Sequence, residues 1–139
     1  MPLAPEKIKE TYKVELEKSM NLITVTFLPP AYSDSADIEL RAEMISQGCF
    51  NYFNQYPDEK FNLVINLIPL GKSGRVSSKA RKTYAKLLGD KHFNKIAFAG
   101  GNTFLKVVVD FIAIAAGIKS RFKWGLTLEK AREWVNKNK

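Results

Sequence analysis

The segment Gly71–Ser78 has the residue types that bind an anion. It carries Lys72, Ser73 and Arg75, and it leads from a hydrophobic run into a helix that Ser77 or Ser78 should cap. Free amide groups and the helix dipole favour negative charge at such a helix start, and an exposed serine there could accept a phosphate group. We therefore define a candidate regulatory or anion-binding loop. Its residues are Lys72, Ser73, Arg75, Ser77 and Ser78. A simple helix cap is the structural alternative.

The same segment resembles the end of a nucleotide-binding P-loop but does not fit that motif. In a P-loop, glycine-rich backbone amides cradle phosphate, while the lysine and the hydroxyl contact phosphate and magnesium. The first glycine would have to stand at Asn66, inside the predicted strand, and Pro69 removes a backbone donor. This pattern argues against nucleotide hydrolysis.

The chain offers few other groups for catalysis. Cys49 is the one cysteine and lies among residues with core periodicity, which predicts a buried thiol. His92 is the one histidine and follows Lys91 in a predicted turn, where we expect an exposed side chain without a role. Spacing identifies no acid–base pair, so we predict no catalytic, cofactor-binding or metal-binding residue, and a protein that is not an enzyme.

The elements that position these residues follow from hydrophobic periodicity. Alternating apolar residues predict antiparallel strands around Tyr12–Leu16 and Ile23–Phe27, and three- and four-residue spacing predicts a helix from Asp34 or Ser35 to Pro57. After Phe61, strand and helix patterns alternate. Strands are predicted at 61–68, 95–99 and 120–124, with helices from Ser78, Thr103 and Thr127.

This order predicts one layered α/β domain. Its sheet should be mixed and mostly parallel, opened by an N-terminal antiparallel hairpin and covered by about four helices. We expect the domain to span residues 12–139, after an N-terminal extension of residues 1–11.

The helix predicted after Asn102 is apolar nearly all round. It is too short to cross a bilayer, so it should be buried between layers or partly exposed to a partner, a lipid or a second subunit, and we expect burial. Four of its apolar positions form a candidate partner or ligand surface: Phe104, Val108, Phe111 and Ile112.

The net charge of +8 is unevenly distributed along the chain. Residues 1–70 hold six Lys or Arg and ten Asp or Glu, whereas residues 71–139 hold sixteen and four. The basic segment 71–139 could attract nucleic acid, anionic lipid or an acidic partner. Its lysines are scattered and lack interleaved aromatic residues, however, which favours an ordinary solvated surface. A charged N-terminus, a single cysteine and no apolar membrane span predict a cytoplasmic protein.

The C-terminal sequence KIAFAGGNTFLKVVVDFIAIAAGIKSRFKWGLTLEKAREWVNK resembles the STAS-like family related to sporulation anti-sigma factor antagonists. In that family a strand leads through a long apolar helix and a short strand to a terminal helix, whose pattern here falls on Ala131, Trp134 and Val135. The upstream segment LVINLIPLGKSGRVSSKARKTYAKLL resembles its central strand, loop and serine-capped helix, and the resemblance covers about residues 12–137.

The resemblance implies a mixed sheet, no metal or cofactor, and a role in binding or regulation. The antagonists carry an Asp-Ser-Ser-Gly type phosphorylation motif at the helix start, where this chain has Arg75-Val76-Ser77-Ser78-Lys79. A phosphoswitch at Ser77 or Ser78 is therefore a hypothesis based on position.

Together these observations predict a non-catalytic, STAS-like regulatory or protein-interaction module. The expected partner is a protein that the sequence does not identify, and a homodimer is an open alternative. A second reading is a binder of a small apolar ligand or lipid beneath the 104–118 helix, and a third is a basic nucleic-acid-binding protein.

Overall fold

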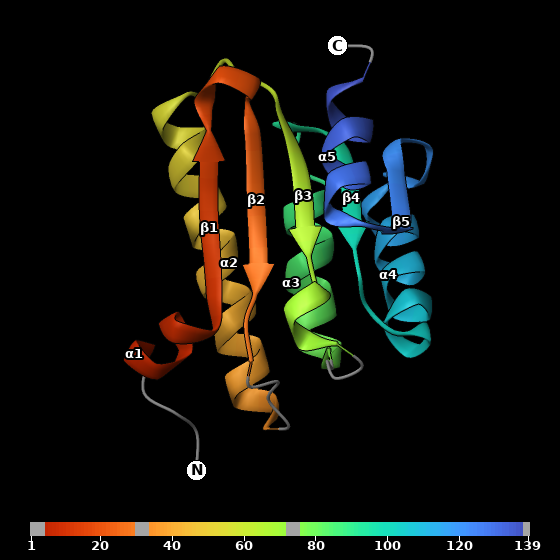
Figure 1. Ribbon diagram of the computed structural model, residues 1–139. Helices are drawn as coiled ribbons and strands as arrows, with labels where there is room; N and C mark the ends of the chain where they lie inside the picture. The colour runs from red at the N-terminus through yellow and green to blue at the C-terminus, as the bar shows by residue number, and fades with distance from the viewer. Residues whose placement is uncertain (1–4, 30–33, 72–75, 138–139) are drawn as a thin grey trace.

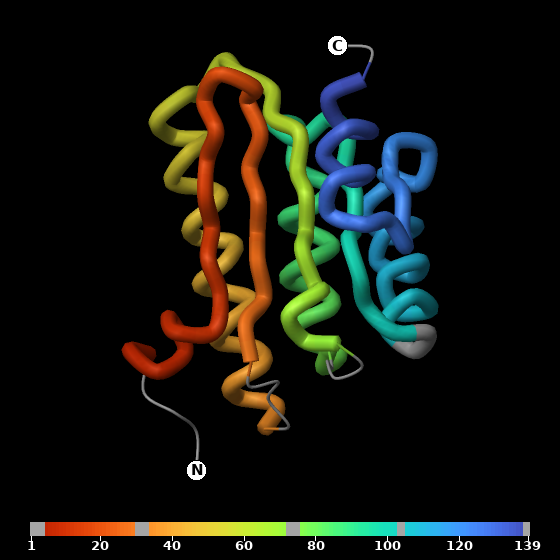
Figure 2. The backbone as a smooth tube through the Cα atoms, viewed as in Figure 1, coloured from red at the N-terminus to blue at the C-terminus, as the bar shows by residue number. Residues whose placement is uncertain are grey.

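The computed structural model describes residues 5–29, 34–71 and 76–137, apart from the side chains at 103 and 104. A five-stranded sheet crosses the molecule in chain order (Figures 1 and 2). Its strands are β1 (Tyr12–Glu17), β2 (Leu22–Phe27), β3 (Phe61–Asn66), β4 (Phe93–Ala99) and β5 (Phe122–Leu126). β1 and β2 pair antiparallel, while β2, β3, β4 and β5 pair parallel.

The hairpin register follows from its tight connection. The short 3-10 turn η2 (Lys18–Met20) and Asn21 join the two strands, and Asn21 has the left-handed φ of 47° that asparagine tolerates well. The register pairs Val14 with Val25 and Leu16 with Ile23, so that the apolar side chains of both strands share one face of the sheet.

Helices cover the two faces of the sheet unequally. Three long helices pack behind the sheet in Figure 1, whereas one packs in front. The three behind are α2 (Ser35–Gln55), α3 (Ser78–Leu88) and α4 (Thr103–Ala116), and the one in front is α5 (Leu128–Asn136). The remaining short turns are α1 (Pro5–Ile8), η1 (Lys9–Thr11), η3 (Ile68–Leu70) and η4 (Lys119–Arg121).

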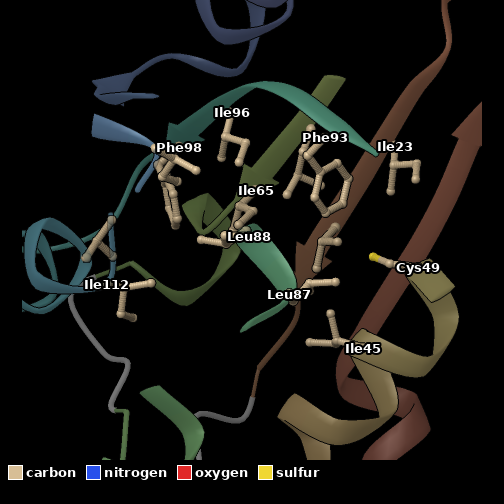
Figure 3. Packing of buried hydrophobic residues seen from close by; sticks show 14 of the residues in the cluster. Ile23, Ile45, Cys49, Ile65, Leu87, Leu88, Phe93, Ile96, Phe98 and Ile112 are labelled. Carbon is tan, nitrogen blue, oxygen red and sulfur yellow. The ribbon is translucent and has the colours of Figure 1, made fainter. Parts of the chain in front are cut away.

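The main core lies between the sheet and α2, α3 and α4. Figure 3 shows Ile45 and Cys49 of α2 and Leu87 of α3 directed toward side chains of the strands, Ile23 and Phe93 among them. A smaller core joins α5 to the opposite face, where Ala131 and Val135 contact β2, β3 and β4. Because β3 is buried along its whole length, it has the near-continuous apolar sequence of an interior parallel strand.

The fold class predicted from the sequence is confirmed. The hairpin, the parallel strands and the interleaved helices are all present, and α2 and α3 begin after the predicted caps Asp34 and Ser77. The residues before β1 also pack against the domain, because Ile8 is buried among α2 and α3 side chains. Within the described ranges no helix has the length and apolarity needed to cross a membrane.

Candidate functional site

The two serines at the start of α3 have different surroundings. The Ser77 Oγ accepts a hydrogen bond from the Ala80 amide at 3.1 Å and donates one to Glu39 Oε2 at 3.2 Å. Ser78 is exposed, and its Oγ accepts a hydrogen bond from Arg81 Nη2 at 3.1 Å. Ser77 is thus the helix cap, while Ser78 remains accessible beside a guanidinium group.

The rest of the candidate loop, Lys72, Ser73 and Arg75, lies outside the described residues. Gly71 ends η3 with a left-handed φ of 59°, and Val76 lines the cavity described below. The described part of the loop therefore supplies a helix start and an exposed hydroxyl.

The predicted surface on α4 is divided by the structure. Val108 and Ile112 face the core, whereas Phe111 is 63% exposed; the Phe104 side chain lies outside the described residues. Val107 and Ile114 share the exposed side with Phe111, at 54% and 58% exposure. The expectation that α4 is buried was therefore wrong, since one side of the helix faces solvent.

A shallow groove runs between α3 and α4 and brings two of the predicted regions together. Ser78, Arg81, Lys82 and Ala85 contribute from α3, and Phe111, Ile112 and Ala115 contribute from α4. The groove surface is largely apolar, and its α3 side includes the basic residues Arg81 and Lys82. One groove thus brings Ser78, the accessible end of the candidate loop, together with Phe111 from the exposed side of the apolar helix.

An apolar cavity of about 50 Å³ lies behind this surface, between the sheet and the three helices that cover it. Among the described residues, twelve line it: Phe27, Arg41, Ile65, Leu67, Leu70, Val76, Tyr84, Leu88, Phe98, Leu105, Val109 and Ile112. Arg41 is 3% exposed, and its guanidinium carbon lies 4.9 Å from the centre of the Phe27 ring.

Tyr84 also contributes a polar group to this cavity. Burial raises the pKa of its hydroxyl to about 12, while the charge of Arg41 and a hydrogen bond from it act in the opposite direction. The hydroxyl is therefore protonated throughout the physiological range.

The side chains of Cys49 and His92 are both largely buried. Burial raises the pKa of the Cys49 thiol to about 12, so the reactive thiolate is disfavoured, as the sequence predicted for a buried cysteine. The expectation for His92 was wrong. Its ring is mostly buried, stacks on Phe53 with centroids 4.5 Å apart, and places Nδ1 2.7 Å from Asp90 Oδ1 and Nε2 3.1 Å from the Pro57 carbonyl oxygen.

No group of three or more His, Cys, Asp or Glu side chains that could hold a metal ion occurs in the described ranges 5–29, 34–71 and 76–137. No protein-family model, characterised protein or solved structure matches this chain significantly. The structure is a mixed α/β fold whose α3 and α4 together present apolar and basic residues.

Sequence reasoning missed Arg41, Val107 and Ile114. Arg41 lies three residues after Ile38 and four before Ile45, which places it on the buried stripe of α2. Its spacing could therefore have revealed it. Val107 and Ile114 carried no such sign, because a helix that is apolar all round does not show from its sequence which side packs inward.

Proposed function

We propose that this protein is a non-catalytic, STAS-like interaction module that binds a protein partner through α4 and the adjoining end of α3. The observation that carries the proposal is the row of three large apolar side chains, Val107, Phe111 and Ile114, exposed on one side of α4. Neighbouring exposed apolar side chains often mark a binding surface, and an aromatic residue at the centre is a typical anchor of an interface.

The supporting argument is energetic. Covering large apolar side chains with a partner removes them from water at roughly 25 cal/mol per Å² of apolar surface. Phe111 is the most exposed of the three, and it stands between the other two in the row. A partner that covers the row gains most of its binding free energy there.

The resemblance to anti-sigma factor antagonists suggests how such binding could be regulated, by a phosphate group on Ser78. Ser78 is exposed at the first position of α3, beside Arg81, and it lines the groove. A phosphate there would meet free helix amides and a guanidinium, both of which stabilise it. Phosphopeptide mass spectrometry of the protein from its own host tests this, and a Ser78 that never carries phosphate under any growth condition contradicts it.

Binding of an apolar ligand is the second candidate, favoured by the cavity with Arg41. Its volume of about 50 Å³ is small beside the roughly 150 Å³ of an apolar cavity that holds benzene. A fatty acid would therefore require α4 to separate from the sheet. Nucleic-acid binding ranks third, because it is supported by the basic charge of the second half alone.

The test is co-purification from the native host after chemical crosslinking. We expect the wild type to carry a reproducible protein partner, which the double variant Phe111→Ser, Ile114→Ser loses. Ile68→Ser is the matched control, because Ile68 is 47% exposed but belongs to η3 and not to α3 or α4. Retention of the same partner by the double variant, or a bound small molecule in native mass spectra without any partner, would contradict the proposal.

A further inference from the structure

We propose that the groove between α3 and α4 binds an amphipathic helix of the partner, with acidic residues flanking the apolar stripe of that helix. This inference rests on the proposed function and adds the shape and charge of the partner segment. It is carried by the juxtaposition of an apolar helix side with a basic helix side across one groove.

The shape of the surface suits a helix. Phe111 of the exposed row lines the groove, and Val107 and Ile114 extend the row beyond the groove lining. The three residues are spaced by four and three, so they form a line of roughly 10 Å along α4 at 1.5 Å per residue. An amphipathic helix presents apolar residues with the same spacing. Ala85 and Ala115 line the groove from opposite sides, and their small side chains leave room for a third helix to approach.

The charge of the groove selects an acidic occupant. α3 contains four basic residues and no acidic one, and Arg81 and Lys82 lie in the groove itself. The hydrogen bond from Arg81 to the Ser78 hydroxyl holds its guanidinium at the start of the helix. Carboxylates on the side of the partner helix next to α3 would therefore meet two cations at the edge of an apolar contact.

The same charge disfavours a second copy of this chain as the occupant. In a two-fold dimer each copy would contribute the same surface, which would bring one basic α3 toward another. The chain as a whole also carries a net charge of +8. Repulsion between like charges opposes such a dimer interface, whereas the basic residues of α3 attract an acidic helix.

A bilayer containing anionic lipid has a similar chemistry, but the shape of this surface fits it less well. Val107, Phe111 and Ile114 project from α4 as membrane-inserting groups do, but Ile112 and Ala115 help to form a hollow between α3 and α4. A helix fills such a hollow, whereas the flat face of a bilayer does not. Membrane binding in the test below would overturn the proposal.

The test is selection from a displayed library of helices. Each member has about 18 residues with a fixed leucine stripe at helical spacing, and the positions flanking the stripe are randomised among Glu, Lys, Gln and Ser. We expect selection on the wild-type protein to enrich Glu beside the stripe. We also expect the Arg81→Glu, Lys82→Glu double variant to enrich Lys there instead. Lys91→Glu, an exposed reversal outside the groove, should select as the wild type does.

Affinities of a selected acidic peptide supply the second readout. Phe111→Ser should weaken binding about tenfold or more, because truncating a central aromatic anchor commonly costs at least 1.4 kcal/mol. Ile68→Ser should bind as the wild type does. Amide shifts on adding the peptide should be confined to α3 and α4, and circular dichroism verifies that every variant is folded.

Several results would overturn the proposal. Selection could enrich no helices, or enrich them without regard to charge. Phe111→Ser could leave peptide binding unchanged. The protein could also bind phosphatidylglycerol vesicles and no peptide. If the native partner is lost from the α4 variants while selection ignores charge, the proposed function stands and this inference fails. If selection finds acidic helices while the native partner ignores the α4 variants, the proposed function fails instead.

Discussion

Ser77 and Ser78 are adjacent in sequence, yet their hydroxyl groups make different contacts at the start of α3. Ser77 satisfies a free amide of the helix and also contacts Glu39 of α2, so it ties two helices together. The Ser78 hydroxyl accepts a hydrogen bond from an arginine at the surface.

Replacing each serine by alanine should therefore have different effects on stability. We expect Ser77→Ala to lower the free energy of unfolding by about 1 kcal/mol, the usual cost of a lost N-cap. Ser78→Ala should change it by less than about 0.5 kcal/mol, as surface substitutions generally do. Urea unfolding at neutral pH measures both, and equal losses would show that Ser77 is not the cap in solution.

Cys49 should make stability fall at alkaline pH. Burial raises the pKa of its thiol from 9.0 to about 12, so the unfolded chain releases this proton first. The contribution is therefore complete below pH 9 and decreases as the pH rises toward 12. Tyr84, whose pKa is also raised, acts in the same direction from about pH 10.

The variant Cys49→Ala isolates the thiol. Between pH 9 and pH 10 the wild type should lose about 1 kcal/mol more stability than this variant. Chemical unfolding at each pH gives the difference. Parallel curves for the two proteins would mean that the thiol is already accessible in the folded state.

Two connections between elements are held together by His92. The ring stacks on Phe53 of α2 and lies within hydrogen-bond distance of the Pro57 carbonyl after α2 and of Asp90 before β4. His92→Ala should therefore lower stability by about 2 kcal/mol, from a lost ring contact and a lost hydrogen bond.

Lys91→Ala is the control for this prediction, since Lys91 is next to His92 in the chain and its side chain is exposed. Thermal unfolding followed by circular dichroism compares the two variants. If both variants shift the unfolding midpoint equally, the contacts of the His92 ring contribute no more to stability than an exposed side chain does.

The two ends of α4 provide a matched pair of glycines. Gly100 precedes the helix with a φ of 77°, and Gly117 ends it with a φ of 73°. A Cβ on Gly100 would lie 2.8 Å from the Ile68 backbone nitrogen, whereas one on Gly117 would have nothing within 4 Å. Both positions have a positive φ that is unfavourable for alanine, but of the two only Gly100 adds a clash.

Gly117→Ala should cost about 1–2 kcal/mol, the penalty of left-handed backbone for an L-residue. Gly100→Ala should cost a further 1–3 kcal/mol or so, because backbone atoms must move to admit the methyl group. Denaturant unfolding of both variants gives the difference. Equal losses in the free energy of unfolding would indicate that the backbone around Ile68 moves to admit the methyl group without destabilising the fold.

Distant parts of the chain meet where β1 approaches α5. Arg132 donates from Nη1 and Nη2 to the two carboxylate oxygens of Glu17, at 2.6 and 3.0 Å. The hydrogen bond from Arg132 lowers the pKa of the Glu17 carboxyl. The pair therefore stabilises the fold above the ordinary range of a glutamate, and this contribution is lost as the pH falls through the lowered pKa.

Arg132→Gln should destabilise the protein by up to about 1 kcal/mol at low salt, because both partners are partly exposed and water screens them. The loss should shrink in 1 M salt and at acidic pH. Lys130→Gln, an exposed neighbour on α5, is the control. A loss that is the same at every salt concentration would point to packing of the arginine stem instead.

Periodicity was enough to predict the sheet, the hairpin, the helix caps and the buried cysteine, because each depends on local spacing and on the side-chain types of a few neighbouring residues. The sites depended on contacts between distant residues. His92 looked exposed beside Lys91, but α2 brings Phe53 and Pro57 against it.

The exposed side of α4 was decided by tertiary structure alone. Its sequence is apolar all round, so the sheet and α3 determine that Val108 and Ile112 pack inward and that Val107, Phe111 and Ile114 face solvent. The joining of that apolar side to the basic α3 arises in the same way, since residues some 30 positions apart line one groove. Sequence alone determined which elements form, and packing between them determined the surface that they present.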